Sequence, residues 1–382
     1  MLPLTYALRN LFRDKSRLAQ TVGGSALVVL LVMAATALNS GMAEVLSASG
    51  SPRNAILIGA GSEESIQRSE VSAQLGGIAE VGIPGVSTIL GTPAVSTEIH
   101  YMSFLETAGG GKGQGLFRGV TPKALLVHPE VRIMEGTFPR AGEVMVGKLA
   151  WRKLGLPQEA LRPGKTVKLD GSEMTVSGVF AAPGTVMESE IWTVLGDLYM
   201  LAQRDTVSCV VLRMETSDDF SEVDLFSQQR LDLELAALRE TDYYAALSSF
   251  YKPLRVMTWI TAGLVAAGAV FGGFNTLYAA FASRIRELAT LQAIGFGRVA
   301  VFFSLVQESV IACLGGTLLA SAAAMVLLDG RTIPFSIGAF TVTISPQVAV
   351  TGLVTGVLLG IFGSIPPAIR CLRPSLPRAL RS

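Results

Sequence analysis

Four long apolar stretches constrain this chain more than any other feature. Residues 19–43, 256–283 and 347–369 contain no charged residue, and residues 299–328 contain only Glu308. A helix needs about 20 predominantly apolar residues to cross the hydrocarbon core of a bilayer. Half of the 382 residues are hydrophobic and only 16% are charged, which is too apolar for an ordinary soluble domain. The sequence therefore predicts an α-helical membrane protein with four transmembrane helices.

The first apolar stretch follows a basic segment, as the core of a signal peptide does. Its uncharged run is longer than the roughly 7–15 residues of such a core. We therefore expect this stretch to remain as the first transmembrane helix.

The charged residues between the apolar stretches predict the orientation in the membrane. Short loops rich in lysine and arginine stay in the cytoplasm. The long insert 43–253 contains 18 basic and 26 acidic residues and so has a net charge near −8. Three short segments are basic instead: the N-terminal segment (Arg9, Arg13, Lys15 and Arg17 against Asp14), the segment between the second and third stretches (Arg284, Arg286 and Arg298 against Glu287) and the tail (Arg370, Arg373, Arg378 and Arg381). We expect both termini and the 284–298 segment to be cytoplasmic and the insert to be extracytoplasmic.

These expectations divide the chain into nine consecutive parts. They are an interfacial amphipathic helix (1–18), the first transmembrane helix (19–43), a mixed α/β extracytoplasmic domain (44–253), the second transmembrane helix (254–282), a short cytoplasmic helix (283–298), the third transmembrane helix (299–328), a short extracytoplasmic loop (329–346), the fourth transmembrane helix (347–369) and a basic cytoplasmic tail (370–382). The first part could equally continue the first transmembrane helix into the cytoplasm.

The insert reads as one or two α/β subdomains inserted between the first and second transmembrane helices. Its apolar and alternating segments predict strands, and a short helix should end at Gly155. We also expect residues 219–246 to be helical. The predicted strands are NAILIGAG (54–61), EVMVG (143–147), KTVKLD (165–170), EMTVSGVF (173–180) and SCVVLRM (208–214).

The sequence contains no recognisable pattern of catalytic or metal-binding residues. AGGGKGQG (108–115) lacks the G-x-x-x-x-G-K-[ST] pattern of a phosphate-binding loop, so we read it as a flexible loop. His100 and His128 are far apart in the sequence, which predicts neither a zinc site nor a catalytic triad. The pair Glu188 and Glu190 is typical of a solvated surface. We expect no catalytic residue, no metal, no cofactor bound by this chain and no nucleic-acid partner.

Small residues recur at four-residue spacing in three of the predicted transmembrane helices. Such stripes let helix backbones approach closely in lipid, although glycine is also generally common in membrane helices. The predicted packing residues are Gly268, Gly272, Gly316, Gly352, Gly356 and Gly360.

Glu308 is an ionisable residue within the third predicted transmembrane helix. Such a residue indicates a functional site by default. A structural role in the helix bundle is at least as good an interpretation as a role in transport.

The segment RIRELATLQAIGFGR (284–298) predicts a short amphipathic helix. Ile285, Leu288 and Leu291 fall on one side, and Gly295 and Gly297 end the helix before the next apolar stretch. The apolar stripe must be buried against lipid headgroups or in a groove of a protein. Because both ends are tied to membrane helices, a force on this helix would move the two together.

Here the sequence resembles the MacB/FtsX-like permeases, which include the LolC/LolE type. Similar segments are NTLYAAFASR (275–284), RELATLQAIGF (286–296), ESVIACLGG (308–316) and, in the insert, GEVMVGKLAWRKLGL (142–156) with MESEIW (187–192). The resemblance covers essentially the whole chain.

The resemblance implies that the short cytoplasmic helix is a coupling helix, seated in a groove of an ATPase. No ATPase is fused to this sequence, so a separate ABC ATPase would supply ATP and magnesium. The contact residues implied are Arg284, Ile285, Arg286, Glu287, Leu288, Leu291, Ala293, Ile294, Gly295 and Phe296. A second permease chain, identical or paralogous, would pair with this one in the bacterial inner membrane.

The resemblance thus implies a permease subunit that passes ATP-driven motion to its extracytoplasmic domain, by mechanotransmission. The substrate to be exported or extracted would be amphiphilic: a lipoprotein, lipid, peptide or hydrophobic small molecule. A periplasmic membrane-fusion protein or substrate carrier would be a further partner. The alternative is an FtsX-like signalling scaffold that controls an extracytoplasmic partner such as a cell-wall hydrolase.

Overall fold

The computed structural model describes residues 4–373 and contains two units. The helical unit comprises residues 1–40, 253–331 and 342–382, and the α/β unit comprises residues 41–252 and 332–341. The arginines predicted at 378 and 381 lie outside the described residues. The α/β unit is therefore built from two separate segments of the chain.

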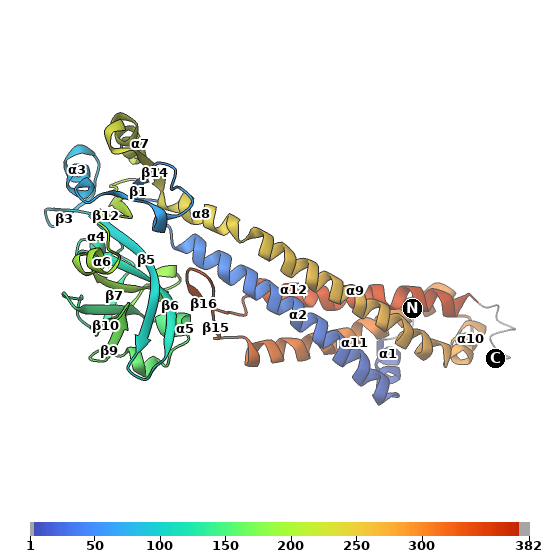
Figure 1. Cartoon of the computed structure of the whole chain (residues 1–382). Helices are drawn as coiled ribbons and strands as arrows, with labels where there is room; N and C mark the ends of the chain where they lie inside the picture. Colours follow the sequence, from blue (N-terminus) through green and yellow to red (C-terminus); the bar gives the residue numbers. More distant parts are fainter. Residues whose placement is uncertain (1–3, 374–382) are drawn as a thin grey trace. The chain divides into compact units, whose positions relative to one another are not determined.

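The helical unit contains four helices that are long and apolar enough to cross a membrane. They are α2 (Lys15–Ala48, whose last turns belong to the α/β unit), α9 (Lys252–Ala282), α11 (Arg298–Leu327) and α12 (Pro346–Leu372). Two short helices, α1 (Leu4–Leu11) and α10 (Ile285–Ala293), lie at the end of this unit where α2 begins (Figure 1). All four transmembrane helices were predicted, because each needs only a local run of apolar residues.

The predicted N-terminal helix is shorter than expected. α1 ends at Leu11, and the backbone turns before α2 begins at Lys15, so the amphipathic helix predicted within residues 1–18 is not a single helix. The alternative is correct in part, because residues 15–18 continue the first transmembrane helix. Asp14 lies in this turn, where its Oδ1 accepts a hydrogen bond from the backbone N–H of Arg17 at 3.1 Å. A carboxylate there satisfies one of the free N–H groups at the start of a helix.

Glycines permit close helix contacts within this unit. A Cβ atom at Gly352 would lie 2.8 Å from Met33 Sδ of α2, and one at Gly360 would lie 2.7 Å from Val310 Cα of α11. Cβ atoms at Gly316 and Gly356 would overlap Ser25 and Thr317 respectively. At these four positions a larger residue would push neighbouring helices apart.

The two predicted packing glycines of α9 behave differently. A Cβ atom at Gly268 or Gly272 would have no other atom within 4 Å. The other helices of this chain do not pack on α9 at these positions, so the prediction that they are contact points is wrong for the chain by itself.

The α/β unit is built on a ten-stranded sheet in the order β14-β1-β13-β5-β6-β11-β8-β10-β7, with β9 paired to both β10 and β5. The pairing of β9 closes β5, β6, β11, β8, β10 and β9 into a ring. The strands are β1 (Asn54–Gly59), β5 (Val95–Thr107), β6 (Lys112–Val120), β7 (Arg132–Gly136), β8 (Glu143–Gly147), β9 (Thr166–Leu169), β10 (Ser172–Ala181), β11 (Ile191–Val194), β13 (Cys209–Arg213) and β14 (Leu235–Arg239).

The long strand β5 connects the two halves of this unit. Its first half pairs with β13, from Val95 to Glu98, and its second half pairs with β9, from Leu105 to Thr107. The insert therefore has two parts, a closed ring of strands and a sheet extension formed by β14, β1 and β13. They share one continuous apolar core, which includes Leu57, Ile99 and Val167.

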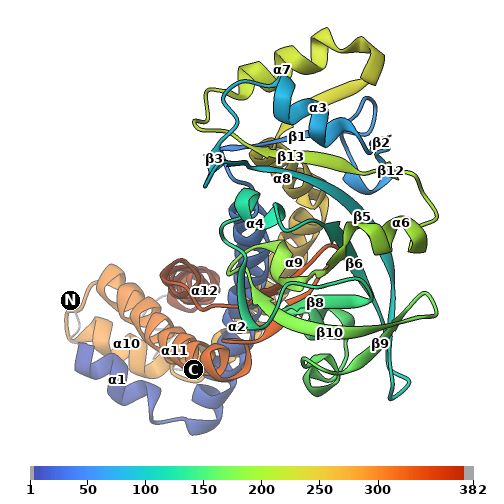
Figure 2. The same cartoon turned by 90° about the vertical axis from the view of Figure 1, so that its left-hand side faces the viewer.

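Short helices and two-stranded ladders complete the α/β unit. Figure 2 shows α3 and α7 together over the β1 end of the sheet. The remaining elements are α3 (Leu75–Gly82), α4 (Ala124–Val127), α5 (Ala150–Leu154), α6 (Leu195–Leu201), α7 (Phe220–Gln229), α8 (Glu240–Phe250), the 3₁₀ turns η1 (Ile66–Arg68), η2 (Gln158–Leu161), η3 (Val186–Ser189) and η4 (Leu231–Leu233), and the strands β2 (Val71–Ser72), β3 (Thr88–Ile89), β4 (Thr92–Pro93), β12 (Thr206–Val207), β15 (Thr332–Pro334) and β16 (Ala339–Thr341).

Two local predictions in the insert need correction. Residues 219–246 do not form one helical segment, because β14 separates α7 from α8 and pairs with β1. The glycine-rich stretch 108–115 is not wholly a loop, because β6 begins at Lys112 and pairs with β5. By contrast, α5 ends at Gly155, whose φ of 68° is the left-handed conformation that glycine favours.

Candidate functional site

The helix predicted between the second and third transmembrane helices is α10. Two residues after it ends, Gly295 adopts a φ of 111°, which L-residues with side chains avoid, and the chain then enters α11 at Arg298. The predicted stop at the glycine-rich segment therefore has a backbone cause.

The apolar stripe of α10 is buried inside this chain. Leu288 and Ala289 are each only 2% exposed, and Leu288 packs with Leu277 of α9 and Val301 of α11. Leu291 and Phe296 are partly buried against the same cluster. Leu288 is therefore unavailable to a partner protein, and its predicted place in an ATPase contact is wrong.

The opposite face of α10 is exposed. Arg286, Thr290, Ala293 and Gly295 are exposed, and Ile294 is 71% exposed although it is a large aliphatic residue. A partner that binds α10 would contact this outer face.

Glu308 holds α10 to the rest of the helical unit. Its carboxylate accepts hydrogen bonds from Arg17 of α2 (Nη2–Oε1, 2.5 Å) and from Arg284 (Nη1–Oε2, 3.0 Å), which immediately precedes α10. The side chains of Arg17 and Arg284 are each 11% exposed, and that of Glu308 is 6% exposed. Removing one partner of an ion pair that is shielded from water leaves the other charge buried and uncompensated, which is costly.

The ion pairs continue outward from Glu308 to the surface. Arg284 also pairs with Glu287 (Nε–Oε2, 3.2 Å), and Glu287 pairs with Arg13 (Oε1–Nη1, 2.6 Å). We call these five residues the Glu308 junction. It links α2, the start of α10 and α11 at one end of the helical unit.

Sequence reasoning found Glu308, Arg284 and Glu287 but assigned no site role to Arg13 and Arg17. Both were counted only as basic residues that set orientation. An intramembrane acid needs a cationic partner, and this need could have directed attention to the arginines at the start of the first transmembrane helix.

A second linkage lies within the α/β unit. The hairpin β15–β16, which connects α11 to α12, packs against the inserted domain. Lys153 Nζ donates a hydrogen bond to the backbone oxygen of Phe335 (2.8 Å), and the backbone N–H of Ala339 donates to Ser189 Oγ (2.9 Å). Phe340 is buried. The segment predicted as a short loop is therefore an integral part of the α/β unit.

The α/β unit also contains a buried cluster of charged residues around Glu98 of β5. Arg118 Nη1 donates to Glu98 Oε2 (2.7 Å), while His100 and His128 each place Nε2 3.2 Å from a Glu98 oxygen. Arg118 also forms two hydrogen bonds with Glu190. These five residues form what we call the Glu98 cluster.

Mutual interactions explain how these charges remain buried. Burial acts to raise the pKa of Glu98, but Arg118 and the histidines hold it well below its ordinary value. Burial acts to lower the pKa of His128, but Glu130 and Glu98 raise it to about 10. Burial, together with Arg118, lowers the pKa of His100. Two carboxylates are thus balanced by Arg118 and protonated His128.

The fold therefore brings together residues that lie far apart in the sequence. His100 and His128 meet at one carboxylate, and Glu190 is buried rather than solvated. Ligand atoms of Glu98, His100 and Cys209 lie within 4.8 Å of one another. However, the Arg118 guanidinium is hydrogen-bonded to the Glu98 carboxylate and would repel a metal cation. This donor set therefore does not suit a metal.

Comparison with known proteins assigns the chain to a family. The MacB-like periplasmic core domain matches residues 19–224, and the FtsX-like permease C-terminal region matches residues 259–376. Because the first match covers more than half of the chain, the chain belongs to the MacB/FtsX-like family of ABC transporter permeases. It is a membrane protein with an extracellular α/β domain. No curated protein sequence matches it.

Solved structures resemble the chain at low sequence identity. The periplasmic region of MacB from Actinobacillus actinomycetemcomitans is 10% identical, with a TM-score of 0.40 over 54% of this chain and 97% of that one. The extracellular domain of the noncanonic ABC-type transporter YknZ from Gram-positive bacteria is 16% identical, with a TM-score of 0.37 over 48% and 97%. A domain of a putative permease from Porphyromonas gingivalis is 14% identical, with a TM-score of 0.33 over 48% and 86%.

Proposed function

We propose that this chain is the permease subunit of an ABC transporter whose ATPase is a separate protein. ATP hydrolysis in that partner moves α10, and the motion passes through the transmembrane helices to the extracellular domain, which exports or extracts an amphiphilic substrate. In this arrangement both termini and α10 are cytoplasmic, as the basic segments favour. A second permease chain completes the transporter.

The two faces of α10 carry this proposal. The inner face, with Leu288 and Ala289, is buried in the chain's own core, while the outer face is exposed around Ile294. A helix that is only peripherally attached would turn or slide when pushed. Because α10 is packed and ion-paired to its neighbours, a force on its outer face is passed to them.

The Glu308 junction specifies which helices receive that force. Arg284 and Arg17 share the carboxylate of Glu308, so displacement of α10 pulls on both α2 and α11. A conformational change of this kind needs contacts that differ between the two states of the partner ATPase.

At the other end of α11, the chain continues directly into the β15–β16 hairpin. The hairpin is held to the rest of the α/β unit through Lys153 and Ser189. Displacement of α11 or α12 along its axis would therefore act on the extracellular domain at this hairpin as well as at α2 and α9. This supports mechanotransmission in which the domain is driven through all four helices.

The test is co-purification of the tagged full-length chain with a protein that has Mg-ATPase activity. Ile294→Asp should lose that protein, because a buried aliphatic contact worth about 1.5–3 kcal/mol would be replaced by a charge. Ile294→Val should retain it. Leu288→Asp should instead destabilise the chain itself, seen as a lower thermal unfolding midpoint in detergent. An ATPase that stays bound to Ile294→Asp at wild-type levels would contradict the proposal.

A further inference from the structure

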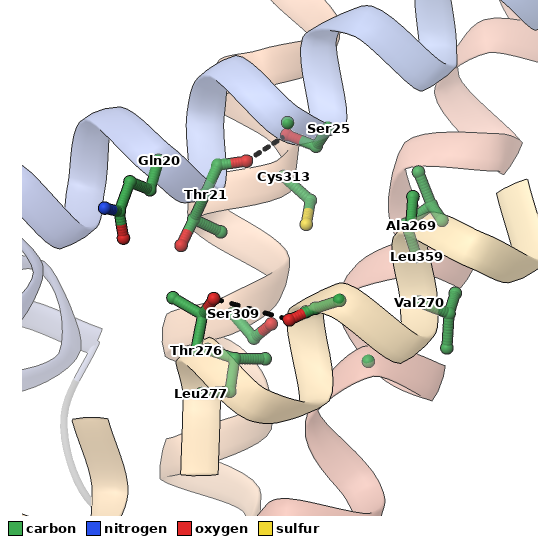
Figure 3. Close-up of a pocket in the computed structure, with 14 residues that line it drawn as sticks. Gln20, Thr21, Ser25, Ala269, Val270, Thr276, Leu277, Ser309, Cys313 and Leu359 are labelled. Atoms are coloured by element: carbon green, nitrogen blue, oxygen red, sulfur yellow. Dashed lines mark hydrogen bonds between the residues drawn. The ribbon is translucent and has the colours of Figure 1, made fainter. Parts of the chain in front are cut away.

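The four transmembrane helices line a partly open cavity of about 340 Å³ within the helical unit. Each helix contributes lining residues, among them Thr21 of α2, Thr276 of α9, Ser309 of α11 and Leu359 of α12 (Figure 3). The cavity is within the size range of small-ligand sites, and most of its lining is apolar with a few polar groups.

Glycines produce this space. A Cβ atom at Gly24, Gly272 or Gly273 would meet no other atom within 4 Å. These residues thus differ from Gly316, Gly352, Gly356 and Gly360, where a Cβ atom would clash with a neighbouring helix. The first group leaves volume open, while the second group brings helices together.

Ser309 provides a polar group without a partner in this cavity. The residue is 3% exposed, and its Oγ has no hydrogen-bond partner among the described residues. In contrast, the hydroxyls of Ser25 and Thr276 donate to backbone oxygens of their own helices. A buried hydroxyl without a partner is costly in an apolar medium, so Ser309 offers a hydrogen bond to a molecule in the cavity.

A second, polar depression adjoins the cavity on the α10 side. It has a volume of about 370 Å³ and is lined by polar residues of both charges, including Asp14, Arg17 and Asn275. Gln20 and Thr276 line both spaces. At about 1.5 Å per residue, Thr276 lies only ~9 Å from the end of α9. The combined site is therefore apolar inside and polar at its mouth.

We propose that this cavity binds the acyl chain of a membrane amphiphile. The hydrocarbon chain lies between α9 and the other three helices, an oxygen at its head accepts the hydrogen bond of Ser309, and the polar headgroup lies at the mouth near Arg17. Arg17 lines this mouth and pairs with Glu308, so the ligand borders the Glu308 junction. The inference does not depend on the proposed ATPase, because it concerns the permease chain alone.

Photolabelling of the purified full-length chain in lipid nanodiscs tests the proposal. One arm uses a phospholipid with a diazirine in its acyl chain, and the other uses a diazirine fatty acid. Label from either probe on the peptide that contains Ser309 and Cys313 supports the site and identifies the source of the chain. If neither probe labels this peptide, the proposal is overturned.

Cavity-filling variants make the test specific. Gly272→Leu should reduce labelling about tenfold or more, because its side chain would enter the space that the acyl chain needs. Gly263→Leu, on the same helix and outside the cavity, also adds its side chain into open space and should label like the wild type. Ser309→Ala should reduce labelling about fivefold through the lost hydrogen bond. Equal labelling of the two leucine variants would overturn the proposal.

Discussion

The two charged clusters of this protein share one plan and differ in their surroundings. Glu98 binds Arg118 and His128 in the α/β unit, and Glu308 binds Arg17 and Arg284 in the helical unit. Each is a glutamate held by two cationic side chains. The Glu98 cluster is almost completely buried within one strand framework and its connections, whereas the Glu308 junction leads through Glu287 to Arg13, which is 68% exposed.

This difference in surroundings determines what each cluster can do. The residues of the Glu98 cluster are positioned by paired strands and short connections of a single domain, so its charges have no route by which to separate without unfolding it. The Glu308 junction joins three helices. Its outer ion pair, Arg13 with Glu287, is exposed, so water can replace this contact at little cost in free energy. The first cluster therefore fixes a structure, while the second can transmit a displacement.

The largest expected effect comes from Glu98→Gln. The substitution leaves Arg118 and His128 buried without the shared anion, and breaking a buried ion pair in this way costs about 3–5 kcal/mol. Denaturant titration of the full-length chain in detergent measures the loss in the free energy of unfolding. Glu106→Gln is the matched control, because it lies on the same strand but pairs with Lys112 at the surface. Equal, small losses in both variants would show that the cluster is not structurally important.

A smaller effect is expected from Glu308→Gln. Arg17 and Arg284 would lose hydrogen bonds to a charged acceptor, worth about 1.5–3 kcal/mol, but both lie near the end of the helices. The measurement is hydrogen–deuterium exchange of residues 285–293, which should become faster. Glu287→Gln, at the exposed outer pair, should change the stability of α10 by less than about 1 kcal/mol. If both variants exchange like the wild type, the junction does not hold α10.

The smallest expected effect is the change in stability produced by a single unit of pH. The folded state raises the pKa of His128 from an ordinary value of 6.5 to about 10. Its contribution is therefore complete below pH 6.5 and is lost as pH rises toward 10, at up to about 1.4 kcal/mol per pH unit for one proton. Thermal unfolding midpoints across this range measure the slope. His128→Gln should flatten it, and an unchanged slope in that variant would assign the effect to other groups.

Local sequence signals predicted much of the fold. Runs of apolar residues marked the four transmembrane helices, and alternation marked β8, β9 and β10. These elements could be predicted because a transmembrane helix or a strand is recognised within one short window of residues. Gly155 and Gly295 were read correctly as stops for the same reason, since each turn requires a local backbone conformation.

The amphipathic helix α10 shows where a local signal becomes ambiguous. Its pattern indicated that Leu288 and Leu291 must be buried, but not against what. The structure buries Leu288 in the chain's own core and leaves Ile294 outside. The pattern of one helix defines its apolar face, whereas the identity of the covering surface depends on elements elsewhere in the chain.

Local composition and short motifs thus sufficed to predict the four membrane-spanning helices, the inserted α/β domain and the family resemblance. Three contacts are visible only in the folded chain: His100 and His128 share Glu98, Arg17 reaches Glu308, and the hairpin near Phe335 belongs to the inserted domain. Each of these contacts joins residues from separate elements. Packing of whole elements brings such residues together, and no local window of sequence contains that information.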